Sequence, residues 1–226
     1  MTTAGLLLAA GAGRRMGGPK ALRRTVDGVS WVALRAADLA RGGCGEVVVV
    51  LGAAAAEAAA TLPAQLPGPD GEPVPVVVVT AADWAEGMGA SLRAGLRHLS
   101  AASRADDGPA VALVALVDTP DVGPAVVARL VDAVAAEGIS SRQLLARAAY
   151  RGRPGHPVVI GRDHWDAVTA VAHGDAGARG YLAVHAVRPL ECGDVGDDRD
   201  LDVPDDLAQP GDDLRGEGRV RSDGLG

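Results

Sequence analysis

Glycines and basic side chains follow the first apolar run of the sequence. Residues 5–10 are apolar, and the turn after them carries Gly11, Gly13, Arg15 and Lys20. Glycine lets the backbone pass close to a ligand because it has no Cβ, and fixed positive charges bind phosphate oxygens strongly. In open α/β sheets, ligands bind beyond the carboxyl ends of the strands. The turn therefore predicts a site for a phosphorylated ligand.

Two familiar phosphate-binding patterns fit this turn poorly. A Walker loop needs Gly-Lys followed by Ser or Thr, whereas Lys20 stands between Pro19 and Ala21. A dinucleotide fingerprint needs GxGxxG, whereas residues 11–17 read GxGxxxG. That fingerprint also needs an acid that ends the second strand, whereas Glu46 begins an apolar run. The Walker loop is excluded, and a dinucleotide-binding oxidoreductase stays as an alternative of another class.

Carboxylates stand at two places where they could face this turn. Asp118 comes directly after the apolar residues 110–117, whereas Asp121 is expected to start a helix. Hard cations such as Mg²⁺ take oxygen ligands and keep several waters, so Asp118 suits a Mg²⁺-bound triphosphate. The second acidic segment, residues 200–207, would on its own be typical of a solvated turn. The residues alone therefore predict one metal ligand, Asp118.

The order of these motifs resembles a known enzyme family. Residues 8–20, LAAGAGRRMGGPK, are similar to the LAAGxGxRMGxPK signature of nucleotidyltransferases, in particular the molybdenum cofactor cytidylyltransferase branch. Residues 86–96 resemble the family's EGMxxSLxxGL segment, which lines the nucleobase pocket. Residues 155–157 and 174–179 resemble its RGHPV and GDxGAR motifs, where the acceptor substrate would bind. The matched motifs cover residues 6–207, essentially the whole chain that we expect to be ordered.

The resemblance assigns roles to individual side chains. It implies that Lys20, Arg15 and Asp118 are catalytic, and that Asp118 and Asp202 hold Mg²⁺. The implied nucleotide-binding residues are Leu8, Ala9, Ala10, Gly11, Gly13, Arg15, Lys20, Gly89, Ser91 and Asp118. The implied acceptor-binding residues are His156, Asp175 and Arg179. For Ser91, a helix N-cap role is also expected, and it is compatible with base contact.

Two positions depart from the family's motifs. Val117 replaces the glycine of the GDxP motif that carries Asp118. Val203 replaces the usual threonine of the DIDTPEDL motif that carries Asp202. Both expected metal ligands are retained, and each departure concerns the residue next to a ligand.

The activity implied by the resemblance is Mg²⁺-dependent transfer of CMP from CTP to molybdopterin, or to the molybdenum cofactor, with release of pyrophosphate. The LAAG form of the first motif favours CTP over GTP, because the guanylyltransferase branch has LAGG. Alternatives are guanylyl transfer, transfer to a sugar phosphate or another small phosphate, and a non-catalytic nucleotide-binding protein that escorts the cofactor. We also expect a transient contact with a molybdoenzyme.

Composition limits the partners and the location. The 226-residue chain has a formal net charge of −7, which argues against a nucleic-acid or anionic-membrane surface. Two cysteines without metal spacing indicate reduced thiols, and no apolar run is long enough to span a bilayer. Small-molecule substrates and a cytoplasmic location are therefore expected.

The elements that must position these residues alternate along the chain. The expected strands are residues 5–10, 46–51, 74–80, 110–117, 143–150 and 156–160. The expected helices are residues 30–40, 89–99, 124–137, 163–171 and 178–187. Nearly continuous apolar strands separated by helices predict an α/β fold, a single-domain three-layer αβα Rossmann-like arrangement with a mostly parallel sheet. The resemblance implies its nucleotidyltransferase (GT-A-like) form. Residues 1–208 are the expected domain, residues 63–75 a loop and residues 209–226 a disordered tail.

Overall fold

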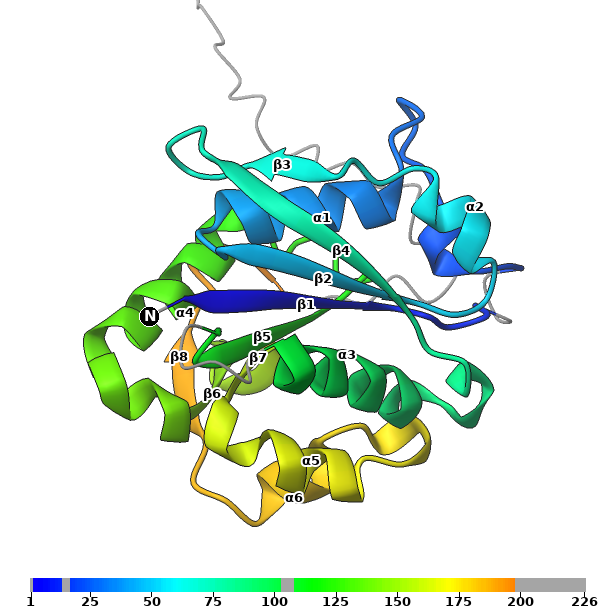
Figure 1. Ribbon diagram of the computed structural model, residues 1–226. Coiled ribbons are helices and arrows are strands. Elements are labelled where there is room, and N and C mark those ends of the chain that lie inside the picture. Colours follow the sequence, from blue (N-terminus) through cyan, green and yellow to red (C-terminus); the bar gives the residue numbers. More distant parts are fainter. Residues whose placement is uncertain (1, 14–16, 103–107, 198–226) are drawn as a thin grey trace, which may run out of the picture.

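A central sheet with helices on both faces organises the molecule (Figure 1). The computed structural model describes residues 2–13, 17–102 and 108–197. The strands are β1 (Thr3–Ala9), β2 (Glu46–Leu51), β3 (Gln65–Pro67), β4 (Pro73–Thr80), β5 (Val111–Leu116), β6 (Leu145–Tyr150), β7 (Arg153–Gly161) and β8 (Arg188–Glu191). The α-helices are α1 (Trp31–Arg41), α2 (Ala55–Ala59), α3 (Met88–Ala102), α4 (Pro124–Glu137), α5 (Trp165–Val171) and α6 (Arg179–Ala183). Short 3₁₀ turns relevant to the site are η2 (Lys20–Leu22), η3 (Trp84–Glu86) and η6 (Gly174–Ala176).

The eight strands follow the order β3-β4-β2-β1-β5-β7-β6-β8. The central strands β4, β2, β1 and β5 run parallel, and β8 runs parallel to β6. Strands β3 and β7 pair antiparallel to their neighbours. The sheet is therefore mostly parallel, as the continuous apolar runs of the sequence predict.

Alternate residues of each central strand face different helical layers. On β1, Leu7 and Ala9 pack into the core beneath α1 and α4, whereas Leu6 and Leu8 pack into the core beneath α3 and α5. Figure 1 shows α1 and α4 on one side of the sheet and α3, α5 and α6 on the other. Because β1 is buried on both faces, its sequence is continuously apolar. This arrangement confirms the three-layer αβα fold.

The strand order reverses next to β1, which creates a place for a ligand. The chain goes from β1 outward to β2 and β4, and then returns to form β5 on the opposite side of β1. Register pairs Leu8 of β1 with Leu116 of β5, so the segments that follow both strands leave the same edge of the sheet. In open α/β sheets, ligands bind outside the carboxyl ends of the strands at such a reversal. The glycine-rich turn and Asp118 therefore lie at the expected ligand edge.

Several elements differ from the expectations. Residues 65–67 form β3 within the segment that we expected to be a loop, because an edge strand tolerates prolines that a central strand does not. Strand β8 and helix α2 were not expected from the sequence. Both are short, and β8 is largely exposed at the edge of the sheet, so neither has a strong hydrophobic periodicity. Helix α6 covers only the first part of the expected residues 178–187.

Among the residues that the structure describes, no helix is both long enough and apolar enough to cross a membrane.

Candidate functional site

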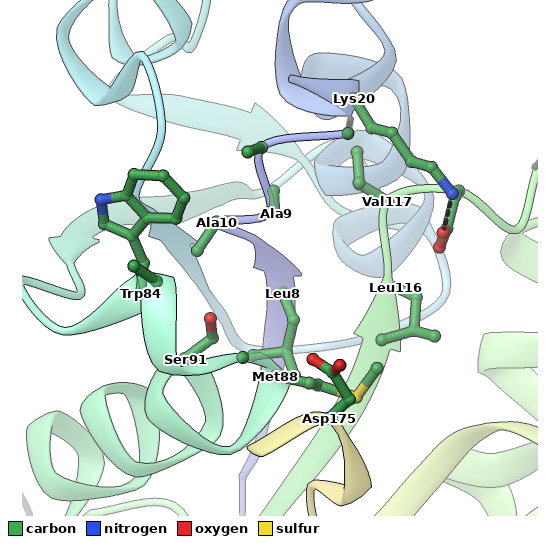
Figure 2. Close-up of a pocket in the computed structure, with 16 residues that line it drawn as sticks. Leu8, Ala9, Ala10, Lys20, Trp84, Met88, Ser91, Leu116, Val117 and Asp175 are labelled. Atoms are coloured by element: carbon green, nitrogen blue, oxygen red, sulfur yellow. Dashed lines mark hydrogen bonds and ion pairs between the residues drawn. The ribbon is translucent and has the colours of Figure 1, made fainter. Parts of the chain in front are cut away.

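A cavity of about 560 Å³ opens at the carboxyl ends of β1 and β5, and we call it the first cavity (Figure 2). Its lining residues come from the glycine-rich turn, from η2 and η3, from the start of α3 and from the segment after β5. They are Leu8, Ala9, Ala10, Gly11, Ala12, Gly13, Lys20, Trp84, Ala85, Gly87, Met88, Ser91, Leu116, Val117, Asp118 and Asp175. The structure thus brings together most of the nucleotide-binding residues expected from the sequence.

The glycine-rich turn closes on itself because of its glycines. Gly13 has a φ of +56°, in the left-handed region that favours glycine, and the amide of Gly18 donates a hydrogen bond to its carbonyl oxygen at 3.1 Å. A Cβ on Gly13 would collide with the carbonyl group of Gly18. A Cβ on Gly11 would instead meet open space. Gly11 thus leaves the backbone open toward the cavity, and the close approach of Gly13 to Gly18 lies next to Lys20. Arg15 lies outside the described residues.

Lys20 and Asp118 form an ion pair at one end of the first cavity. Lys20 Nζ lies 2.6 Å from Asp118 Oδ2, and the two side chains are 16% and 21% exposed. Lys20 begins η2, whereas Asp118 follows the end of β5 by two residues. Lys20 is also the single lysine of the chain, beside 21 arginines. The lysine ammonium is a compact charge on a flexible side chain, so it can move from a carboxylate partner to a phosphate partner.

The donor set at this edge fits a hard cation only in part. Asp118 supplies carboxylate oxygens, the ligands that Mg²⁺ prefers. Within residues 2–13, 17–102 and 108–197, no group of three His, Cys, Asp or Glu side chains could hold a metal ion. A cation that is bound at Asp118 together with a nucleotide would take further ligands from phosphate oxygens and waters, as is usual for Mg²⁺. Asp202, the second expected metal ligand, lies outside the described residues.

The far end of the first cavity is formed by the start of α3. Helix α3 begins at Met88, so Ser91 lies inside its first turn and the expected N-cap role is wrong. Ser91 is 5% exposed and lines the cavity. Gly89 is not among the lining residues, and a Cβ there would lie only 2.7–2.8 Å from the backbone of Ala172 and His173. The small residue lets α3 approach the segment after α5 closely.

The two motifs at residues 86–96 and 174–179 meet in space. Gly87 has a φ of +117°, and a Cβ on it would lie 2.6 Å from Asp175 Oδ1. Asp175 lines the first cavity and also a neighbouring cavity of about 520 Å³, which we call the second cavity. Leu8 and Met88 line both cavities as well. The two cavities are therefore adjacent and share a wall.

The second cavity gathers all three expected acceptor-binding residues, His156, Asp175 and Arg179. Its walls are otherwise largely apolar. The apolar lining residues are Leu8, Met88, Leu92, Val114, Ala149, Pro154, Val158, Ile160, Ala176, Ala178, Leu182, Ala183, Val187 and Pro189. Tyr150 Oη donates a hydrogen bond to the carbonyl oxygen of His156 at 2.7 Å, which fixes the backbone beside the imidazole.

Arg147 also lines the second cavity and was missed from the sequence. Its Nε and one terminal nitrogen donate hydrogen bonds to the carbonyl oxygen of Gly155 at 3.2 and 3.0 Å. These bonds hold the guanidinium beside the first residues of β7, the strand that carries His156. A lone arginine within an Ala-rich strand has no motif around it, so no local signal marks it.

Arg93 connects the walls of both cavities, and it too was missed from the sequence. Its buried guanidinium donates hydrogen bonds to Asp83 at 2.5 Å, to Glu86 at 2.7 Å and to the carbonyl oxygen of Ala172 at 2.7 Å. The hydrogen bond from Arg93 lowers the pKa of Asp83. The bonds to both carboxylates raise the pKa of Arg93 further above its already high value. The guanidinium thereby ties η3 to the segment between α5 and η6.

Comparisons with known proteins fit this architecture. Residues 5–189 match the family described as MobA-like NTP transferase domain. The chain is 37% identical over 207 residues to nicotine blue oxidoreductase of Paenarthrobacter nicotinovorans. This alignment covers 90% of this chain and 93% of that protein. The crystal structure of Rv0371c from Mycobacterium tuberculosis H37Rv superposes with a TM-score of 0.66 and 28% identity, over 92% of this chain and 97% of Rv0371c.

A second crystal structure of Rv0371c is a complex with manganese. It superposes with a TM-score of 0.58 and 26% identity, over 84% of this chain and 88% of that chain. The family match covers most of the chain, and the curated relative matches it over nearly its full length. The resemblance inferred from the motifs is therefore confirmed: the chain belongs to the MobA-like NTP transferase family and is a nucleotidyltransferase.

Proposed function

We propose that the protein transfers CMP from CTP to molybdopterin, or to the molybdenum cofactor, with Mg²⁺ as cofactor and pyrophosphate as second product. The observation that carries this proposal is the Lys20–Asp118 pair at the end of the first cavity, next to a second cavity with cationic groups. A cation for phosphates, a carboxylate for a metal and an adjoining acceptor site are the parts that such a transfer needs.

The reaction brings two anions together, so electrostatic repulsion between them is the main part of its activation barrier. A phosphate oxygen of the acceptor attacks the α-phosphorus of CTP, and the bond from that phosphorus to the bridging oxygen of the β-phosphate breaks. Lys20 exchanges its contact with Asp118 for the β- and γ-phosphates and stabilises the negative charge of the departing pyrophosphate. Gly11 and Gly13 leave the backbone free to approach the phosphates. Arg15 adds a second cation in this proposal.

Asp118, together with Asp202, would hold the divalent cation, which neutralises phosphate charge when it is bound. The manganese complex of Rv0371c supports a divalent cation in this fold. The proposed choice of Mg²⁺ rests on the oxygen donor of Asp118.

The second cavity supports an acceptor with an anionic group and an apolar body. Arg179, Arg147 and His156 bring cationic or proton-donating groups to its lining, whereas Asp175 is the acid that lines it. Arginine guanidinium groups recognise phosphate through paired hydrogen bonds. The apolar walls suit a flat ring system. The choice of CTP rests on the LAAG form of residues 8–11.

The test is an assay of the purified protein with each of the four ribonucleoside triphosphates, Mg²⁺ and molybdopterin, with pyrophosphate as readout. We expect release with CTP and little with the others. Release with GTP alone would instead favour the guanylyl alternative. Binding of CTP without release of pyrophosphate would favour a non-catalytic escort.

The single lysine allows a second, structural test. An amine-acylating reagent can modify only Lys20 and the N-terminus, and mass spectrometry separates the two products. We expect Mg²⁺ and CTP together to protect Lys20 and to leave the N-terminal amine as reactive as before. The Lys20→Arg variant is the matched control, because it keeps the positive charge and has no side-chain amine. Equal acylation of Lys20 with and without CTP would contradict the proposed phosphate contact.

A redox reaction is the second candidate, because the relative at 37% identity is named nicotine blue oxidoreductase. The two adjoining cavities could hold a nicotinamide nucleotide and an aromatic acceptor side by side. The glycine spacing of residues 11–17 and the position of Glu46 count against it. Consumption of reduced nicotinamide dinucleotide in the presence of nicotine blue, without pyrophosphate release from CTP, would favour this candidate.

A further inference from the structure

We infer that the indole ring of Trp84 is the stacking surface for the base of the bound nucleotide, an inference that rests on the proposed nucleotide site. Trp84 belongs to η3 and lines the first cavity. Figure 2 shows it on the opposite side of the end of β1 from Lys20. A nucleotide whose phosphates lie at Lys20 therefore extends its base toward Trp84.

The indole is supported from behind by the end of β2. A Cβ on Gly52 would lie 2.5 Å from Cβ and Cγ of Trp84 and 2.7 Å from the carbonyl oxygen of Ala10. Only a glycine lets the chain after β2 pass so close to both groups. The ring is thereby packed at its attachment and stays partly exposed.

Arg93 holds the turn that carries the indole. Asp83 precedes Trp84 and Glu86 follows it by two residues, and both carboxylates accept hydrogen bonds from the same guanidinium. A turn fixed before the ligand arrives loses little conformational entropy on binding. The turn is therefore built to present an aromatic face.

The chain has few aromatic rings, and the others have different tasks. It contains three tryptophans, two tyrosines and no phenylalanine. Trp31, Trp165 and Tyr150 are buried in the cores, and Tyr181 stacks on His185 at a centroid distance of 3.9 Å. Among the described residues, Trp84 is the aromatic side chain that lines the first cavity. Base stacking in this cavity thus depends on one residue.

The test compares a ligand that has a base with one that lacks it. Binding of CTP and of inorganic tripolyphosphate, each with Mg²⁺, is measured by calorimetry for wild type, Trp84→Ala and Trp84→Phe. We expect Trp84→Ala to weaken CTP binding by about 5- to 150-fold, the range for loss of one base–aromatic stack. Tripolyphosphate affinity should stay unchanged, and Trp84→Phe should keep most of the CTP affinity.

Tryptophan fluorescence gives an independent readout. CTP should quench the emission of the wild type, and the quench should be lost in Trp84→Phe, in which Trp31 and Trp165 remain as internal references. Thermal unfolding of each variant checks that the fold is intact. Because Trp84→Phe is a mild change, it keeps the test valid if Trp84→Ala unfolds.

The outcomes separate this inference from the proposed reaction. Quenching that depends on Trp84, without pyrophosphate release, supports the inference and contradicts the reaction. Unchanged CTP affinity in Trp84→Ala, equal losses of CTP and tripolyphosphate affinity, or an unaltered quench in Trp84→Phe would each overturn the inference. So would a failure of the wild-type protein to bind CTP more tightly than tripolyphosphate.

Discussion

The first and second cavities share a wall but are built in different ways. The first cavity is formed mainly by turns at the carboxyl ends of parallel strands, with small residues and one ion pair. The second is formed by side chains of the antiparallel pair β6–β7 and of α6, with arginines set among apolar groups. Leu8, Met88 and Asp175 belong to both.

This difference separates what the fold supplies from what side chains can vary. A phosphate site made of backbone turns depends on a few charges and on glycines at crowded positions such as Gly13, where a side chain would collide with the backbone. A cavity lined by side chains can change its ligand through a few substitutions without disturbing the sheet. We infer that the first cavity fixes the nucleotide chemistry, whereas the second fixes the acceptor. A family relative whose name states a redox reaction, nicotine blue oxidoreductase, is compatible with such a division.

The largest effect is expected from the charges of the first cavity. Lys20→Ala and Asp118→Asn should each lower kcat/KM for pyrophosphate release by about 10²- to 10³-fold, the usual loss when one group that stabilises developing charge is removed. The pair is partly exposed, so its loss should change the free energy of unfolding by only about 1 kcal/mol.

The matched control for these variants is Arg129→Ala. Arg129 lies on α4, pairs with Asp194 and is not a lining residue of either cavity. This variant should leave kcat/KM within about twofold of wild type, since an exposed ion pair contributes little. Near-normal pyrophosphate release from both site variants would contradict the role of the first cavity.

A smaller effect on both cavities is expected from Arg93→Met. The variant loses hydrogen bonds to Asp83, Glu86 and the carbonyl oxygen of Ala172, so unfolding should become easier by about 1–3 kcal/mol. Because η3 and the segment after α5 lose their common anchor, KM should rise for CTP and for the acceptor together. An increase in one KM alone would show that the two walls are held independently.

The pH dependence of that variant gives a further check. Arg93 lowers the pKa of Asp83 below its ordinary value of 3.8, so this interaction stabilises the folded state above that value and is lost as pH falls through the lowered pKa. The difference in unfolding free energy between wild type and Arg93→Met should therefore be full at neutral pH and narrow below 3.8. Denaturant unfolding across this range measures it, and a difference that widens on acidification would contradict the assignment.

The sequence predicts the first cavity better than the second, and the two constructions explain why. The turn at residues 8–20 is contiguous, so its glycines, Lys20 and the strand before it appear together in the sequence. The fold class was predictable for a similar reason, because both faces of the central strands are buried and leave continuous apolar runs.

The residues that the sequence does not reveal act through distant partners. Arg93 contacts Ala172, and Trp84 packs closely against Gly52. The residues of each pair lie far apart in the sequence, so no local pattern predicts these contacts. Arg147 is an isolated charge in an apolar strand, and such a charge is typical of many solvated edges. Asp202 and Arg15 lie outside the described residues, so their roles stay predictions.

An effect confined to the second cavity is expected from Arg179→Ala. Loss of one charge-assisted hydrogen bond should raise KM for the acceptor by about 10- to 100-fold and leave the KM for CTP unchanged. Steady-state kinetics with each substrate varied in turn separates the two constants. Arg142→Ala is the control, because that arginine pairs with Asp163 at an exposed position. A rise in the KM for CTP instead would place Arg179 in the nucleotide site.

The smallest effect is expected from the two cysteines, which line neither cavity. Burial raises the pKa of Cys44 to about 12 and also raises the pKa of Cys192, so both thiols should be protonated and unreactive in the native protein. A thiol reagent at mildly alkaline pH should modify neither until denaturant is added. Rapid modification of the native protein, with loss of activity, would show that this region is open.

The central claim is that a nucleotidyl group is transferred from CTP bound in the first cavity to an acceptor bound in the second. Its most direct test follows CTP labelled at the α-phosphorus through one reaction with Mg²⁺ and molybdopterin. We predict that the label leaves CTP and joins the acceptor in proportion to the pyrophosphate formed, and that Lys20→Ala slows both by about 10²- to 10³-fold. A label that remains on the nucleotide, while the same protein consumes reduced nicotinamide dinucleotide, would contradict the claim.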